Sequence, residues 1–219
     1  MAWKEDREYR MMPLMEFRQA ENDEPSYRIE GYASTFEPYL LYEEDDKKIY
    51  ERIEPTAFDK ADMSDVLFLY NHEGQVMARQ KNGSLALNVD GNGLHVVADL
   101  GGSSRGREMA EEIRSGLVDQ MSFAFTVAEG GDTVERSEDK KTYTRVIKQF
   151  RKLYDVSAVS VPANPTTSIA CRSAIDGAIK ADEAERLQQE ADERERLAKE
   201  DAERRAAAWA ILKGGEADE

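Results

Sequence analysis

The region from residue 28 to residue 173 is built from short apolar runs separated by turn-forming residues. Residues 28–36 partly alternate between apolar and polar side chains, and residues 66–70 form the continuous apolar run expected of a buried strand. Residues 153–161 are predicted to form a further strand, which ends before Pro162. Runs of this length bury their apolar side chains by pairing into sheets. We therefore predict a mainly β region.

Two hairpins are predicted within this region. The first surrounds Asp90-Gly91-Asn92-Gly93, because Asp, Asn and Gly between two apolar runs are typical of a tight turn. The second lies within residues 123–147 and turns at residues 129–132 or at residues 137–140.

Two helices are predicted to interrupt the strands. A short one covers residues 55–60, with Pro55 in its first turn, where the missing N–H is not needed. A longer one begins near Ser103 or Ser104 and ends near Gly116. Its apolar residues recur every fourth position: Met109, Ile113 and Leu117.

The composition changes near Ala174. Residues 180–213 contain no proline or glycine and are dominated by Ala, Glu, Arg, Lys, Asp and Gln, which strongly favours a helix. Its apolar stripe is thin, so we favour a solvated helix over a stable coiled-coil dimer and leave self-association open. The stripe consists of Ala184, Leu187, Ala191 and Ala198, interrupted by Arg194. A small apolar cluster near the end, suited to docking on a partner, consists of Trp209, Ile211 and Leu212.

The chain is accordingly divided into three parts. Residues 1–27 form a polar N-terminal segment, residues 28–173 form the β-rich domain, and residues 174–219 form a charged helical tail. A chain of 219 residues is long enough for one ordinary domain with such an appendage.

Composition excludes several classes of function. A formal net charge of −15 argues against binding to nucleic acid or to an anionic membrane surface. The single cysteine, Cys171, excludes an internal disulfide and fits a reducing cytoplasm. No His/Cys cluster has the spacing of a zinc site, and we predict no metal or cofactor. The N-terminus lacks the apolar core of a signal peptide, and no apolar run approaches membrane-spanning length, so we expect a soluble protein.

Two residues capable of hydrolytic chemistry lie in or beside apolar runs. His72 follows the run that ends at Tyr70, and Ser122 lies within Met121-Ser122-Phe123. A hydroxyl becomes a nucleophile when a base takes its proton, and histidine suits that task near neutral pH. The chain has only two histidines, and we interpret the other, His95, as structural or exposed on a strand. Each residue alone has a simpler structural explanation, so the pair makes a serine hydrolase a hypothesis.

Asp155 is the candidate third member, because it lies among apolar residues and a buried carboxylate needs a partner. Such an aspartate would hold a histidine in the useful tautomer. Alternatively, it faces solvent or pairs with Arg151 or Lys152, and Glu73 is a less suitable orienting group. Donors for a developing oxyanion could come from four residues: Gly101, Gly102, Gly106 and Arg172.

Seven ordered blocks of the chain resemble the prohead maturation proteases of tailed bacteriophages, which are related in fold to herpesvirus assemblin. Any one block is unspecific, but their order and spacing together are specific. The blocks are Gly31–Ala33, Ile53–Asp59, Leu69–Glu73, Ala78–Leu85, Gly93–Val96, Val118–Phe125 and Tyr154–Pro165.

The resemblance implies a serine endopeptidase that acts inside the immature capsid, in the host cytoplasm. The histidine of the family's Asn-His block is the general base, which corresponds to His72, and the serine after methionine is the nucleophile, which corresponds to Ser122. An acidic residue before Val-Ser corresponds to Asp155, although the family more often has glutamate there. The family also usually has glycine at the position of Ala124.

The resemblance further implies a closed, mostly antiparallel β-barrel surrounded by helices. The implied partners are the major capsid protein and a scaffolding protein or scaffold domain, and the protease would also cleave itself. The charged tail would then be a scaffold-binding or delivery segment removed by self-cleavage. Two alternatives remain: a non-catalytic scaffold protein that retains the protease fold, and an esterase of small substrates, although the chain has no Gly-x-Ser-x-Gly elbow.

Overall fold

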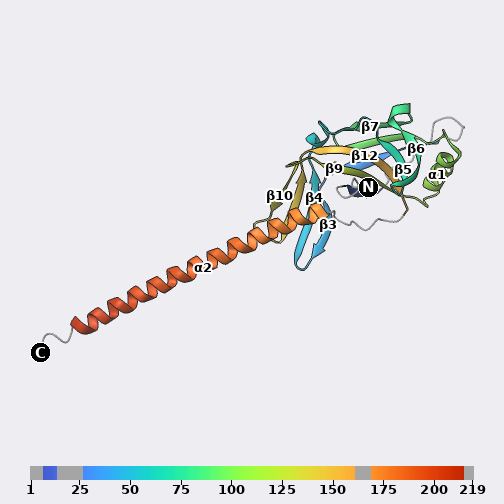
Figure 1. Ribbon diagram of the computed structural model, residues 1–219. Coiled ribbons are helices and arrows are strands. Elements are labelled where there is room, and N and C mark those ends of the chain that lie inside the picture. Colours follow the sequence, from blue (N-terminus) through green and yellow to red (C-terminus); the bar gives the residue numbers. More distant parts are fainter. Residues whose placement is uncertain (1–6, 14–26, 161–168, 215–219) are drawn as a thin grey trace. The chain divides into compact units, whose positions relative to one another are not determined.

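The computed structural model describes residues 7–13, 27–160 and 169–214. The chain divides into two compact units, Met1–Ile175 and Asp176–Glu219, which are described separately (Figure 1). In the described residues the first unit is mainly β and includes helix α1 (Ser104–Arg114) and the start of the long helix α2 (Ile169–Gly214), and the second unit holds the rest of α2. The expected α+β class, dominated by strands, is confirmed.

The described strands form three sheets. All strand pairs are antiparallel except β12 with β5 and β11 with β4. The largest sheet runs in the order β1 (Glu8–Pro13), β9 (Gln120–Val127), β12 (Phe150–Val159), β5 (Leu67–Tyr70) and β6 (Glu73–Arg79). The second runs in the order β10 (Asp132–Arg136), β11 (Thr142–Ile147), β4 (Lys47–Ile53) and β3 (Tyr39–Glu44). The third runs in the order β2 (Arg28–Thr35), β8 (Gly93–Asp99) and β7 (Leu85–Val89).

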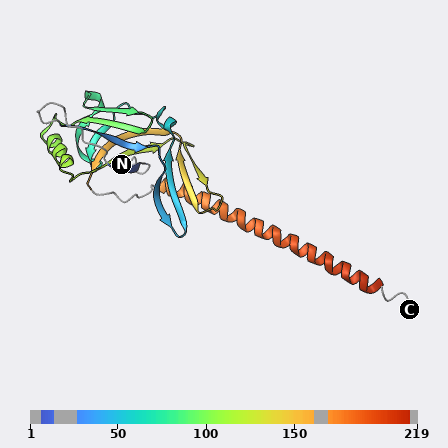
Figure 2. The ribbon, with the colours of Figure 1, turned by 180° about the vertical axis from the view of Figure 1, so that it is seen from behind.

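Both predicted hairpins are present. Strands β7 and β8 pair across the turn at residues 90–92, where Asp90 Oδ1 accepts hydrogen bonds from the Asn92 and Gly93 amides. The second hairpin pairs β10 with β11, so its turn is the one at residues 137–141. Seen from behind, this yellow hairpin lies beside the blue hairpin of β3 and β4 (Figure 2). The four-stranded sheet formed by these two hairpins was not predicted.

The closed barrel implied by the resemblance is wrong for the described part of the chain. Each sheet has two end strands, namely β1 and β6, β10 and β3, and β2 and β7. Closure needs a continuous hydrogen-bonded ladder around the barrel. Between β6 and β7 the chain turns through the 3₁₀ helix η2 (Gln80–Asn82) and Gly83, whose φ of 78° is left-handed. This turn redirects the chain, and β7 pairs with β8 instead of β6.

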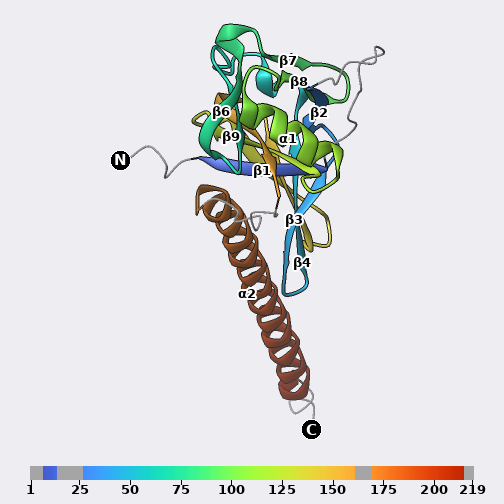
Figure 3. The same ribbon diagram turned by 90° about the vertical axis from the view of Figure 1, so that its right-hand side faces the viewer.

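One face of β9 contributes three large side chains to the core of the first unit. Met121, Phe123 and Phe125 are fully buried, and the Phe125 ring lies 4.8 Å from that of Phe150. Helix α1 (Ser104–Arg114), in front of the sheets in Figure 3, contributes Met109, Ala110 and Ile113 to this core.

The ends of the two predicted helices follow local rules. Ser103 is the N-cap of α1, and its Oγ accepts a hydrogen bond from the Gly106 amide at 3.0 Å. The helix stops before Gly116, which has a φ of 77°, and Leu117 therefore lies beyond the helix and is 72% exposed. The short helix is a 3₁₀ turn, η1 (Pro55–Phe58).

Helix α2 carries exposed ion pairs between side chains on successive turns. Ion pairs at three- and four-residue spacing link Arg186 to Glu190, and Arg196 to both Glu193 and Glu200. The predicted stripe is exposed, with Leu187 58% accessible. The side chains of Trp209, Ile211 and Leu212 lie outside the described residues, as does that of Arg172.

Candidate active site

His72 lies in a two-residue hairpin turn between β5 and β6. Tyr70 pairs with Glu73, and the two central residues, Asn71 and His72, have φ values of 50° and 60°. Positive φ at both central positions is the signature of a type I′ turn, in which asparagine is favoured at the first position. A histidine in this region is strained, and such strain persists where the surroundings hold it. The Asn71 amide donates to the Ala158 carbonyl at 3.0 Å, which ties the turn to β12.

Ser122 lies on β9, an inner strand of the largest sheet. It is opposite Met11 of β1 on one side and Ser157 of β12 on the other. Because side chains alternate along a strand, Ser122 and Ala124 face away from the core that Met121 and Phe123 form. The residue is nonetheless only 1% exposed. The face of β9 opposite the core is therefore covered as well.

A β-bulge in β12 turns Asp155 towards the same face. Leu153 pairs with Phe125 and Asp155 pairs with Ala124, so Tyr154 is the extra residue. Without it, Asp155 would share the core-facing side of Leu153, since residues two apart on a regular strand face the same way. Bulges commonly re-aim a side chain next to an active site.

The three predicted residues meet in a continuous hydrogen-bonded array. His72 Nε2 lies 2.7 Å from Ser122 Oγ, and His72 Nδ1 lies 2.6 Å from Asp155 Oδ1. The same carboxylate oxygen accepts a hydrogen bond from Ser157 Oγ at 2.8 Å. With Nδ1 protonated and donating to Asp155, Nε2 has a lone pair directed at the serine hydroxyl. This arrangement can move a proton from Ser122 to His72.

The alternatives for the acidic residue are not adopted. Asp155 is 2% exposed, whereas Lys152 pairs with Asp62 at 2.6 Å and Arg151 is exposed. Glu73 is also exposed at the start of β6. His95, which was expected to be structural or exposed on a strand, pairs with Glu30 at 3.0 Å on the β2–β8 sheet, and its side chain is 22% exposed.

Two of the glycines considered as oxyanion donors have other roles. The Gly101 amide donates to Asp99 Oδ1 at 2.9 Å, and the Gly106 amide donates to the N-cap Ser103. A Cβ at Gly106 would lie 2.1 Å from the Leu100 carbonyl oxygen, so this glycine permits the close approach of the helix to the chain before it. For Gly101 and Gly106 the suggestion is wrong, because their amides complete the loop and the helix end.

Sequence reasoning missed strand β1 and Tyr9. The Tyr9 ring contacts the His72 ring edge-on, with centroids 4.5 Å apart. Burial raises the pKa of the Tyr9 hydroxyl, Arg7 opposes the shift, and Asp155 and Glu73 add to it. The segment Glu8-Tyr9-Arg10-Met11 has the alternation of a strand, which was the available signal.

The described residues hold no group of three or more His, Cys, Asp and Glu side chains that could bind a metal ion. Within the same part of the chain, neither α-helix is long and apolar enough to cross a membrane.

Comparison with known proteins places the chain among phage proteases. The sequence model of the caudovirus prohead serine protease family matches residues 14–180. The prohead protease of Enterobacteria phage HK97 is 30% identical over 153 residues, which cover 68% of this chain and 61% of that protein. The chain therefore spans less than two thirds of the length of this relative. Among solved structures, the capsid assembly protease of bacteriophage T4 is similar over 72% of this chain and 99% of that one, with 13% identity and a TM-score of 0.41. On the match of the family model to most of its length, the chain belongs to the caudovirus prohead serine protease family.

Proposed function

We propose that this protein is a serine endopeptidase that acts in the maturation of a phage prohead, with Ser122 as nucleophile, His72 as general base and Asp155 as the orienting carboxylate. The observation that carries the proposal is the hydrogen-bonded array from Ser122 Oγ through both ring nitrogens of His72 to Asp155. Family membership supports the reaction class.

The mechanism is acyl transfer in two steps. Ser122 Oγ attacks the peptide carbonyl carbon while His72 Nε2 takes the hydroxyl proton. His72 then gives this proton to the departing amine as the C–N bond breaks. Water hydrolyses the acyl-enzyme by the same route, with His72 again acting as base. Asp155 accepts from Nδ1–H throughout and stabilises the imidazolium.

The substrates we propose are the scaffolding protein or a scaffold segment of the major capsid protein, and the chain itself. A protease with these substrates would act inside the assembling prohead in the host cytoplasm. Support comes from the similar HK97 protein, which is named a prohead protease. Residues 174–219 are proposed to bind scaffold and to be removed by self-cleavage. The helix is exposed and charged, and where it frays its backbone becomes accessible to cleavage by a protease.

Co-expression with the phage capsid and scaffold proteins tests the activity. Wild type should convert these proteins to shorter products, and Ser122→Ala should leave them intact. Ser64→Ala, a serine on the exposed side of the Asp62 turn, is the matched control and should behave as wild type. Full processing by Ser122→Ala would overturn the assignment of the nucleophile and favour a non-catalytic scaffold role.

Mass spectrometry of assembling proheads tests the fate of the tail. Wild type should lose a C-terminal fragment within residues 174–219, whereas Ser122→Ala should retain it. A wild-type tail that stays intact while scaffold is cleaved would reject self-cleavage and leave the protease assignment standing.

A further inference from the structure

Strand β1 forms one side of the candidate site although it precedes the residues that the family model matches. It pairs with β9 along its whole length, and the matched part of the chain begins at residue 14. Tyr9 lies opposite Ala124 and Met11 lies opposite Ser122. Because opposite residues of an antiparallel pair share a face, both side chains stand beside the serine hydroxyl. The N-terminal segment is therefore adjacent to the reacting groups.

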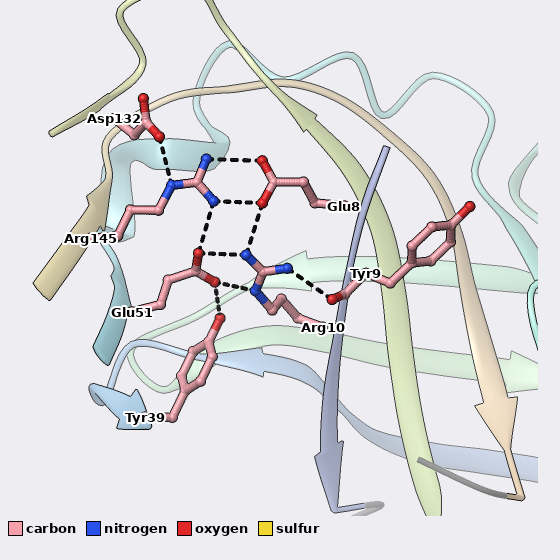
Figure 4. A network of polar contacts seen from close by, with 7 residues as sticks. All are labelled: Glu8, Tyr9, Arg10, Tyr39, Glu51, Asp132 and Arg145. Atoms are coloured by element: carbon pink, nitrogen blue, oxygen red, sulfur yellow. Dashed lines mark hydrogen bonds and ion pairs between the residues drawn. The ribbon is translucent and has the colours of Figure 1, made fainter. Parts of the chain in front are cut away.

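The other face of β1 is held by a buried network of charges, which we call the Arg10 network (Figure 4). Arg10 donates to Glu51 Oε1 at 2.5 Å and to Glu8 Oε2 at 2.8 Å. Arg145 donates to Glu8 at 2.5 Å and to Glu51 at 3.0 Å. Tyr39 and Asp132 complete it through Glu51 and Arg145. Figure 4 shows the Tyr9 ring on the far side of β1 from this network.

The Arg10 network anchors β1 to the rest of the unit through buried ion pairs. Glu8, Arg10, Glu51 and Arg145 are each at most 4% exposed. Departure of β1 would take Arg10 from Glu51 and Glu8 from Arg145, and removing a partner from a buried ion pair is costly. Arg7 adds a further attachment, since its guanidinium carbon lies 3.7 Å from the centre of the Tyr154 ring. Tyr154 is the bulge residue that turns Asp155 towards the site.

Tyr9 is the group through which β1 reaches the reacting atoms. His72 is held at its two nitrogens by Ser122 and Asp155, but its backbone lies in a strained turn. The Tyr9 ring meets the imidazole edge-on at 4.5 Å and restricts its tilt. Small displacements of a catalytic base lower the rate steeply, because attack needs an aligned lone pair.

We propose that Tyr9 is a positioning residue for His72, and that the Arg10 network holds β1 in the register that places Tyr9 there. The proposal rests on the proposed function, since it assigns a role in the same reaction. The protease unit then begins at β1, before the part that the family model matches.

Labelling with diisopropyl fluorophosphate tests the proposal without a known cleavage sequence. In this reaction the Ser122 Oγ–P bond forms as the P–F bond breaks, fluoride leaves, and the hydroxyl proton passes to His72. Tyr9→Ala should lower the second-order labelling rate by about tenfold to a hundredfold. Tyr9→Phe keeps the ring and should restore most of the rate. Equal rates for wild type and Tyr9→Ala would overturn the proposal.

A second tyrosine–histidine pair supplies the matched control. The rings of Tyr32 and His95 lie 5.1 Å apart, and His95 is the only other histidine. In NMR spectra of histidine-labelled protein, Tyr9→Ala should move the His72 ring signals and leave those of His95 in place. Tyr32→Ala should do the reverse and label at the wild-type rate. Movement of both histidine signals in Tyr9→Ala would indicate general unfolding and reject a positioning role.

Arg10→Met tests the network. It should slow labelling at least as much as Tyr9→Ala does. The double variant with Tyr9→Ala and Arg10→Met should be no slower than Arg10→Met alone, because both substitutions act by displacing the Tyr9 ring. Additive losses would reject the link between network and ring. If wild type itself is not labelled, the proposed function fails; if wild type is labelled and only the Tyr9 and Arg10 predictions fail, the proposed function stands.

Discussion

Arginine–glutamate pairs occur in both units of this protein, but they stand in different surroundings. In the β-rich unit, Arg145 is 2% exposed and contacts Glu8 and Glu51. On α2, Arg196 is 61% exposed and contacts Glu193 and Glu200. Water screens the second set, whose pairs add little to stability, whereas each member of the first set depends on its partners. The same contrast separates the buried candidate site from the exposed tail.

The largest expected effect is the loss of chemistry in the buried unit. His72→Ala should slow fluorophosphate labelling of Ser122 by at least about a thousandfold, because the hydroxyl loses its base. His95→Ala makes the same change at the other histidine and should label normally. Labelling of His72→Ala at the wild-type rate would contradict the assignment of His72 as general base.

Asp155→Asn should have a smaller effect on the same reaction. The amide can still contact His72 but no longer stabilises the imidazolium, so we expect Ser122 of this variant to be labelled roughly 10–100 times faster than Ser122 of His72→Ala. Asp62→Asn, at an exposed aspartate paired with Lys152, is the control and should leave the rate unchanged. A loss as complete as that of His72→Ala would show that the carboxylate does more than orient the ring.

Stability should separate the two kinds of ion pair. Glu51→Gln leaves Arg10 and Arg145 buried with too little negative charge and should lower the free energy of unfolding by about 3–5 kcal/mol. Glu200→Gln on α2 should leave the unfolding midpoint unchanged. Urea unfolding followed by far-UV circular dichroism measures the stability of both variants. Equal effects of the two substitutions would contradict the distinction drawn from burial.

The smallest expected effect is a dependence of stability on acid pH. Burial alone would raise the pKa of Glu51, but the charges of Arg10 and Arg145, with hydrogen bonds from Arg10 and Tyr39, outweigh it and lower the pKa. The unfolded chain therefore binds this proton at a higher pH than the folded chain does. The contribution of Glu51 is complete above its unfolded pKa, about 4.3, and is lost as pH falls through the lower folded value. The difference in unfolding free energy between wild type and Glu51→Gln should shrink over that range; a constant difference would contradict the shift.

Local sequence patterns predicted the elements that are specified by residues close together in the chain. The hairpin at residues 90–93, the N-cap at Ser103 and the proline- and glycine-free helix α2 depend on nearest neighbours along the chain. Strands β3, β4 and β6 were missed because charged and polar residues interrupt their apolar pattern, and their stability comes from partners distant in sequence.

Residue types limited the choice of base to two histidines, and the order of the sequence blocks indicated the family and, through the resemblance, His72 and Ser122. Those properties depend on chemistry and spacing along the chain. The tertiary structure decided which groups meet. A bulge at Tyr154 turns Asp155 out of the core, a strained turn brings His72 over Ser122, and β1 arrives from the N-terminus to contact them. Three sheets replace the expected closed barrel. These outcomes depend on strand register and on the pairing of buried charges, which couple residues more than a hundred positions apart and leave little trace in local sequence.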